Sequence, residues 1–166
     1  IALALACEGR FARVVATDVS TDALDVARAN AQHARRTLCA PVEFRHGAML
    51  APLRDPGAPG GPVRARAVVS NPPYIAYSEA DALPPGVRDW EPALALFAGA
   101  DGMAAIAALV REAAPVLEPG GVLAIEVDAR RASVAAELVA SDGRYDGVTV
   151  RLDLAGRERF VLATLA

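Results

Sequence analysis

The chain contains no lysine, so its basic side chains are all arginine apart from two histidines. Cysteine is equally scarce: Cys7 and Cys39 are far apart in the sequence and form no CxxC-type spacing. Such a pair predicts ordinary thiols rather than a disulfide framework or a cysteine-ligated metal site. We therefore expect no bound metal, and the absence of disulfide signals favours the cytoplasm as the compartment.

Long apolar runs are also missing. No stretch approaches the roughly 18 residues that a membrane-spanning helix needs, and no leader of the secretory type is visible. The net charge of −3 argues against tight binding to a nucleic-acid backbone, although a local basic patch is compatible with it. We expect no membrane association, no nucleic-acid partner and a monomeric protein.

The pattern along the 166 residues predicts one α/β domain, because strand-like runs alternate with helical periodicities. This order is typical of a mainly parallel sheet with helices on both faces and a closing antiparallel hairpin. Strands are predicted at Arg13–Asp18, Pro41–Arg45, Ala65–Ser70, Val122–Val127, Val148–Leu152 and Arg159–Ala163, and helices at Ile1–Glu8, from Ser20 or Thr21 onward, at Asp101–Ala114 and at Ala132–Ala140.

Proline and glycine concentrate in the predicted connections. Arg54–Pro62 is rich in both and predicts a mobile surface loop, with an inter-domain linker as the alternative. Pro119–Gly121 predicts a turn before the next strand. Ile75–Gly99 is long and irregular, which is typical of a functional or disordered segment. Within it, Trp90 either lines a substrate groove or anchors the loop as a buried indole.

The sharpest motif is Asn71-Pro72-Pro73-Tyr74, which directly follows an apolar strand. Prolines fix φ and donate no ladder hydrogen bond, so they end the strand in a stiff loop. In an open α/β sheet, ligands bind at this edge. A side-chain amide and a backbone carbonyl held there can both accept hydrogens from a planar, neutral NH2 group. A plain strand-ending turn is the alternative.

Asp18 ends a strand just before a helix. In dinucleotide-type folds an acid at this place accepts hydrogen bonds from ribose hydroxyls. The alternative is an acid that favours the helix N-terminus through the macrodipole. The glycine-rich turn that usually accompanies such an acid is absent from the sequence.

These motifs resemble those of class I S-adenosylmethionine-dependent methyltransferases, and most closely the PrmC/HemK family of protein-glutamine methyltransferases. The likeness runs over nearly the whole chain. It rests on Asp18 and its helix, on Asn71–Ile75, on Arg88–Pro92 followed by Asp101-Gly102, on Pro119–Gly121 with Glu126, and on Asp153, Gly156, Arg157 and Arg159. The four-residue motif is shared with DNA and RNA methyltransferases, whereas the loop and the hairpin favour the protein-modifying branch.

The resemblance implies a Rossmann-like domain over residues 1–166 that lacks its first strand, its glycine-rich loop and the N-terminal helical substrate domain. It implies that S-adenosylmethionine is the methyl donor, with Asp18 at its ribose, Met49 on its adenine and Asn71 near its methyl group. Asn71 and Pro72 would accept the hydrogens of a glutamine amide, and Pro73 and Tyr74 would shape the site. A peptide chain release factor is the implied substrate.

Some positions depart from the family pattern. Ala48 stands where an Asp commonly meets the adenine amine, and Asp128 and Arg131 stand where a Gly and a Gln are common. Two other functions therefore stay open from the sequence. One is a nucleic-acid adenine methyltransferase, because adenine presents a similar NH2 group. The other is an inactive, truncated module with a methyltransferase fold.

Overall fold

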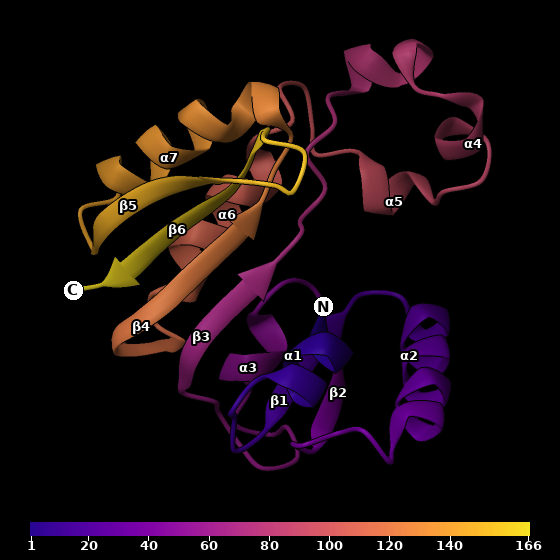
Figure 1. The fold of residues 1–166 in the computed structure, drawn as a ribbon, viewed down its shortest axis with the longest axis vertical. Helices are drawn as coiled ribbons and strands as arrows, with labels where there is room; N and C mark the ends of the chain where they lie inside the picture. Colours follow the sequence, from indigo (N-terminus) through magenta and orange to yellow (C-terminus); the bar gives the residue numbers. More distant parts are fainter. The chain divides into compact units, whose positions relative to one another are not determined.

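The computed structural model describes residues 1–166 and contains two compact units, Ile1–Arg64 and Ala65–Ala166 (Figure 1). The first unit carries a sheet of strand order β1-β2, and the second carries a sheet of order β3-β4-β6-β5. No strand of the first sheet pairs with a strand of the second, so the chain has two separate sheets where a single sheet was expected. The organisation as one partial catalytic domain stays a prediction.

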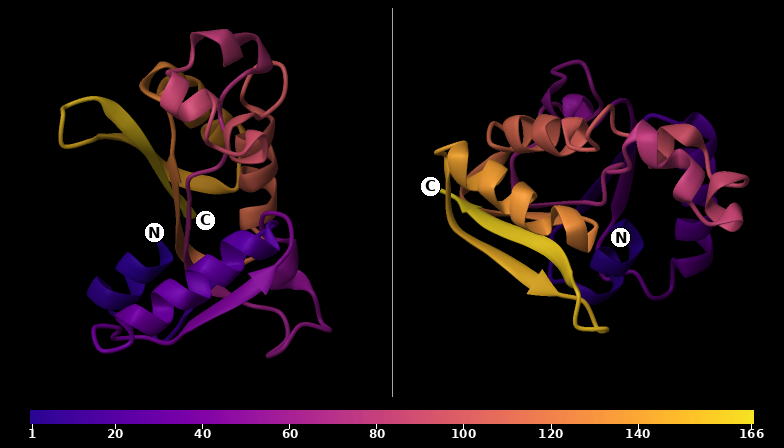
Figure 2. Two further views of the ribbon diagram at one scale, coloured as in Figure 1. Left: turned by 90° about the vertical axis from the view of Figure 1, so that its right-hand side faces the viewer. Right: turned by 90° about the horizontal axis from the view of Figure 1, so that it is seen from above.

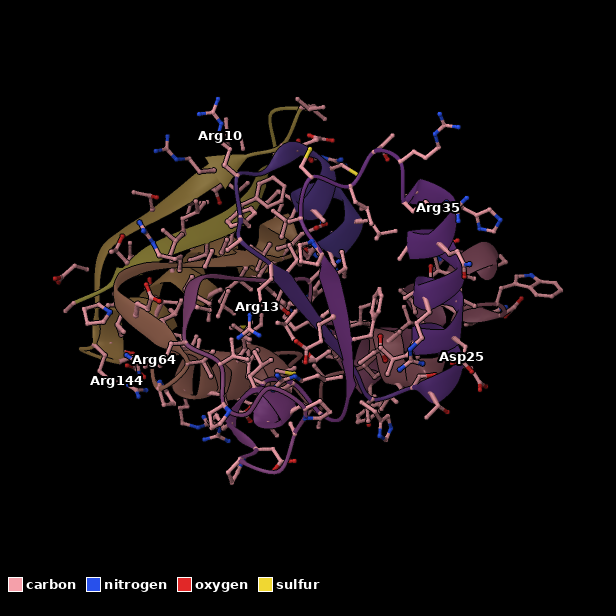
Figure 3. All side chains as sticks on the ribbon, turned by 90° about the horizontal axis from the view of Figure 1, so that it is seen from below. Arg10, Arg13, Asp25, Arg35, Arg64 and Arg144 are labelled. Atoms are coloured by element: carbon pink, nitrogen blue, oxygen red, sulfur yellow. The ribbon has the colours of Figure 1, made fainter.

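The first unit consists of two parallel strands with short and long helices around them. Ser20 begins the long helix as predicted, because its hydroxyl oxygen accepts the Ala23 N–H at 3.2 Å. Figure 3 shows Asp25 near the start of this helix and Arg35 beyond its end. The elements are α1 (Ala2–Glu8), β1 (Val14–Asp18), α2 (Thr21–Ala34), β2 (Val42–His46) and α3 (Ala51–Arg54).

Arg45 organises the loop that follows α3. The residue is only 5% exposed, and its guanidinium donates to the carbonyl oxygens of Pro52, Pro59 and Gly61 at 2.8–3.0 Å. Glu43 pairs with the same guanidinium at 2.6 Å. The Arg54–Pro62 stretch is a surface loop, as expected, but the buried arginine fixes its course where the sequence predicted mobility.

The two cysteines lie close together in the first unit. Both are free thiols, and the Cys39 thiol contacts the Cys7 carbonyl oxygen at 3.2 Å. The two residues are close because α1 packs beside the segment that leads into β2, where the Cys39 N–H donates to the Ala6 carbonyl at 2.8 Å. Their wide separation along the chain gave no indication of this contact. Ala6 and Ala40 form the local core together with Val14.

The second unit begins with β3 and ends with the predicted antiparallel hairpin. Strand β3 pairs parallel with β4, and β4 and β5 both pair antiparallel with β6. The elements are β3 (Ala65–Ser70), α6 (Ala104–Ala113), β4 (Leu117–Glu126), α7 (Ala132–Ser141), β5 (Tyr145–Leu152) and β6 (Glu158–Leu165), with a 3-10 turn, η2 (Ala129–Arg131), before α7.

Helices α6 and α7 lie side by side on one face of this four-stranded sheet (Figures 1 and 2). Leu123 and Ile125 of β4 and Val161 and Ala163 of β6 are buried and share a face by their register. The sequence predicted helices on both faces. In this unit the chain passes from β3 through α6 to β4 and then from β4 through α7 to β5, and both steps run in the same direction across the strand order β3-β4-β6-β5. Because such connections are right-handed, both helices lie on the same face.

The Pro119–Gly121 turn differs from its prediction. It does not precede β4 but lies inside it, because Leu117 already pairs with Ala65 and Val122 pairs with Ala67. The extra residues form a bulge, and Gly120 adopts the left-handed φ of 76° that the bend requires.

The long connection Ile75–Gly99 contains three short helical turns. They are η1 (Tyr77–Ala82), α4 (Pro85–Arg88) and α5 (Ala93–Leu96) (Figure 1). Its ends are joined, since Ile75 bridges Phe97 and the Tyr77 N–H donates to the Gly99 carbonyl at 3.1 Å. The loop is therefore a closed excursion from the end of β3. None of the helices has the length and apolar character needed to cross a membrane.

Replacement of Arg45 by Met tests the anchored loop. We expect the first unit to lose about 2–3 kcal/mol, because hydrogen bonds to a charged group are lost together. Trypsin should then cleave faster after Arg54, which denaturant titration and timed proteolysis can measure. Arg35→Met, at the exposed end of α2, is the control. Equal cleavage of both variants would contradict the anchoring role.

The buried Tyr145 side chain makes the stability of the second unit depend on pH in alkaline solution. Its hydroxyl donates to the Val110 carbonyl at 2.7 Å, and burial raises the pKa of Tyr145 to about 12. The unfolded chain loses this proton near pH 10, so stability is complete below that pH and declines as pH rises towards 12. Tyr145→Phe should reduce the stability of the fold at neutral pH by about 1 kcal/mol. It should also remove the part of the stability loss between pH 10 and 12 that comes from this hydroxyl. Thermal melts at a series of pH values measure both effects.

Candidate functional site

Asn71 lies at the carboxyl end of β3, beside the carboxyl end of β4. Asn71 is exposed, whereas Pro72 directly after it is buried. No other group of the protein hydrogen-bonds the Asn71 side-chain amide or the Pro72 carbonyl oxygen. The motif thus presents two acceptors that the fold itself does not use, on a backbone fixed by two prolines.

The backbone just after the prolines is confined by Gly102. This glycine is buried with a φ of 74°, and a Cβ added to it would collide with the Tyr74 carbonyl oxygen. Only glycine fits such a place, because it tolerates both the left-handed conformation and the close approach. The sequence signalled Gly102 through its family motif but not its contact with Tyr74.

The loop that follows exposes aromatic surface. Tyr77 stacks on Phe97 with ring centroids 5.4 Å apart, which closes the base of the loop. Trp90 is 85% exposed, so the interpretation of a buried indole anchor is wrong.

Asp18 and Met49 lie at the carboxyl end of the first unit's sheet. Asp18 is opposite His46 in the β1–β2 register. Its carboxylate is exposed, and one oxygen, Oδ1, accepts the Ser20 N–H at 2.8 Å. The other oxygen has no partner in the protein and is free to accept from a ligand. The carboxylate thus supports the start of α2 and still presents an acceptor, and its contact with a ribose stays a prediction.

Met49 has an unusual backbone, the only non-glycine residue with a positive φ, at 49°. The Thr17 hydroxyl donates to the Met49 carbonyl at 2.7 Å and holds this conformation. Strained backbone of this kind concentrates at ligand sites. Sequence reasoning missed Thr17, because nothing in its local spacing indicates a contact with a residue after the next strand.

Other polar side chains near these segments have structural roles. His46 hydrogen-bonds the Val19 carbonyl at 3.0 Å and braces the β1–α2 turn. Arg157 and Arg159 pair with Asp153 and so form a salt-bridged turn. The backbone N–H of Arg157, with further help from its guanidinium, keeps the pKa of Asp153 below its ordinary value. His33 is exposed, and no cluster of three or more acidic, histidine or cysteine side chains could hold a metal.

The predicted residues fall into two groups. Asp18 and Met49 share one end of the first unit's sheet, and Asn71, Pro72, Pro73 and Tyr74 form a continuous segment of the second unit. Each group has a geometry that suits a ligand: a free carboxylate oxygen beside a constrained turn in the first, and a free pair of acceptors in the second.

Comparison with known proteins identifies the relatives of this chain, although no family model matches it. It is 42% identical over 163 residues to the release factor glutamine methyltransferase of Moorella thermoacetica, covering 98% of this chain and 54% of that protein. The protein of the same name from Mycolicibacterium smegmatis is 43% identical over 164 residues, covering 99% and 54%. The chain spans about half the length of these curated relatives.

Solved structures show the same fold. An O-methyltransferase from Bacillus cereus in complex with SAH has a TM-score of 0.54 at 17% identity, covering 93% of this chain and 63% of that one. A release factor-specific protein-(glutamine-N5) methyltransferase from Alicyclobacillus acidocaldarius has a TM-score of 0.50 at 20% identity, covering 98% and 86%. The fold is that of the class I methyltransferases, and over about half of their length the chain is similar to the release factor glutamine methyltransferases.

Proposed function

We propose that the protein transfers a methyl group from S-adenosylmethionine to the side-chain amide nitrogen of a glutamine in a peptide chain release factor. The observation that carries this proposal is the free acceptor pair of Asn71 and Pro72 on a rigid strand end. The names of the curated relatives support the substrate, and the SAH complex of a protein with the same fold supports the donor.

The acceptor pair suits the chemistry of an amide nitrogen. That nitrogen is a weak nucleophile, since its lone pair is delocalised into the carbonyl. If the Asn71 side-chain oxygen and the Pro72 carbonyl each accept one hydrogen of the NH2 group, they orient the nitrogen and stabilise the positive charge that develops on it. Orientation of this kind can supply about 7–11 kcal/mol of a barrier. No nucleophilic serine or cysteine is needed.

The first unit offers the groups that would hold the donor. S-adenosylmethionine, when bound, supplies a methyl group on an electrophilic sulfonium. The free carboxylate oxygen of Asp18 can accept a ribose hydroxyl, and the turn at Met49 gives an apolar side chain for the adenine. The methyl side chain of Ala48 cannot accept a hydrogen bond from the adenine amine, so this side-chain contact is absent from the proposed set.

Further expectations belong to this proposal. The chain acts as one catalytic domain of the protein, with no metal and no membrane partner. The protein is monomeric. It works in the cytoplasm, in keeping with two cysteines that stay unpaired although their segments touch.

Asn71→Ala in the natural gene product that contains this chain tests the acceptor pair. We expect kcat for methyl transfer to fall about 10²–10³-fold, by comparison with loss of one preorganised polar group elsewhere. The fold should persist, because the Asn71 side chain bonds to nothing in the protein. Transfer of a radiolabelled methyl group measures the effect, and Gln32→Ala, an exposed amide on α2, is the control.

The substrate is tested in the same assay by offering a release factor and DNA separately. Labelling of a glutamine in the release factor supports the proposal. Labelling of adenine in DNA would replace it by the nucleic-acid alternative, and no labelling of either would favour an inactive module. Near-normal turnover of Asn71→Ala would refute the role of this residue whichever substrate is used.

Asp18→Asn tests the donor half. The amide oxygen can still accept the Ser20 N–H, but the charge that strengthens a bond to a ribose hydroxyl is lost. We expect the dissociation constant for S-adenosylmethionine to rise about tenfold or more, as calorimetric titration would measure. Asp25→Asn, exposed on α2, is the matched control. Unchanged affinity would show that Asp18 serves only the helix start.

A further inference from the structure

The carboxylate of Glu79 ties the long loop to the connection between β4 and α7. Its Oε2 atom accepts the Ala76 N–H at 3.0 Å and also pairs with the Arg131 guanidinium. Its Oε1 atom lies 3.1 Å from the guanidinium of Arg130. Glu79 and Arg131 are 52 residues apart in the sequence, so this contact exists only in the folded unit.

The two arginines differ in their exposure to solvent. The Arg131 side chain is 12% exposed and that of Arg130 is 70% exposed. Exposed ion pairs contribute little, whereas a pair shielded from water is stronger. The hydrogen bond from Ala76, assisted by both arginines, keeps the pKa of Glu79 below its ordinary value despite its burial. Glu79 is therefore charged at neutral pH and bound mainly to Arg131.

Arg131 also borders the substrate motif. A Cβ added to Gly102 would meet both the Tyr74 carbonyl oxygen and the Arg131 Nε atom, the latter at 2.8 Å. The guanidinium and the last residue of the Asn71–Tyr74 motif thus both lie close to the same glycine. Arg131 itself is held by a hydrogen bond from its N–H to the Asp128 carbonyl at 2.9 Å.

These contacts restrain the backbone at the carboxyl end of the motif. Glu79 fixes the N–H of Ala76, and Gly102 confines the carbonyl of Tyr74. Pro72 is buried ahead of them. The backbone from Pro72 to Ala76 is therefore held at both ends. The Arg131 side chain lies against both Glu79 and Gly102, the two residues that restrain its carboxyl end.

We propose that Arg131 is a positioning residue: through Glu79 and Gly102 it fixes the backbone of Tyr74–Ala76 and so the direction of the Asn71 and Pro72 acceptors. The inference rests on the proposed methyl transfer. Arg131 does not touch the reacting atoms, so its loss changes the precision of the acceptors rather than their presence. A small misplacement of oriented groups is enough to lower a rate about 100-fold.

Arg131→Met in the natural gene product tests this role. We expect kcat for methyl transfer to fall about 10- to 100-fold, with KM for the release factor and the affinity for S-adenosylmethionine unchanged within about twofold. Arg131→Lys should recover part of kcat, because an ammonium can still pair with Glu79. Arg130→Met is the matched control: it removes the exposed partner of the same carboxylate and should leave kcat within about twofold.

Hydrogen exchange at the Ala76 amide provides a readout that does not depend on activity. Exchange should accelerate in Arg131→Met and in Glu79→Met, the second variant for use if the first fails to fold, but not in Arg130→Met. Unchanged exchange would overturn the positioning role even if the enzyme is active. A kcat that is preserved in Arg131→Met, or lost equally in Arg130→Met, would overturn it as well. If the unaltered protein methylates no glutamine, the proposed function fails, and exchange alone still decides whether Arg131 restrains this backbone.

Discussion

Two consecutive prolines cannot take part in a β-ladder, and much of the second unit follows from this constraint. They end β3 at Ser70 and turn the chain out of the sheet with Pro72 buried and Asn71 exposed. Because the ladder stops there, the Pro72 carbonyl keeps its free acceptor capacity. The same geometry that interrupts secondary structure therefore creates the polar pair on which the proposed chemistry depends.

The segment beyond the prolines needs restraints from outside the sheet, since it has no ladder of its own. Gly102 confines Tyr74, the Ile75–Phe97 bridge closes the long loop, and Glu79 joins it to Arg131. Each restraint comes from a different part of the chain. A site of this kind depends on packing and ion pairs between distant segments.

Arg45 and Tyr145 show how buried polar groups fix connections that hydrophobic packing does not. The Arg45 guanidinium satisfies carbonyls of a loop that has no secondary structure, and the Tyr145 hydroxyl joins β5 to α6. Buried polar groups are retained in proteins when their hydrogen bonds are complete, and no buried side-chain nitrogen or oxygen atom of this protein lacks a hydrogen-bond partner. These bonds define the course of the chain where apolar contacts alone would allow several.

The sequence by itself determined the order of most strands and long helices, and the motif. Apolar periodicity marked β3 to the residue, the Ser20 cap marked the start of α2, and the prolines placed Asn71 at a strand end, because these signals are local. Tertiary structure alone decided the bulge in β4, the helices on one face of the second sheet, the anchoring by Arg45, the constrained turn at Met49 and the pairing of Glu79 with Arg131. Each of these depends on residues that meet only after folding, and neither composition nor spacing carries information about such contacts.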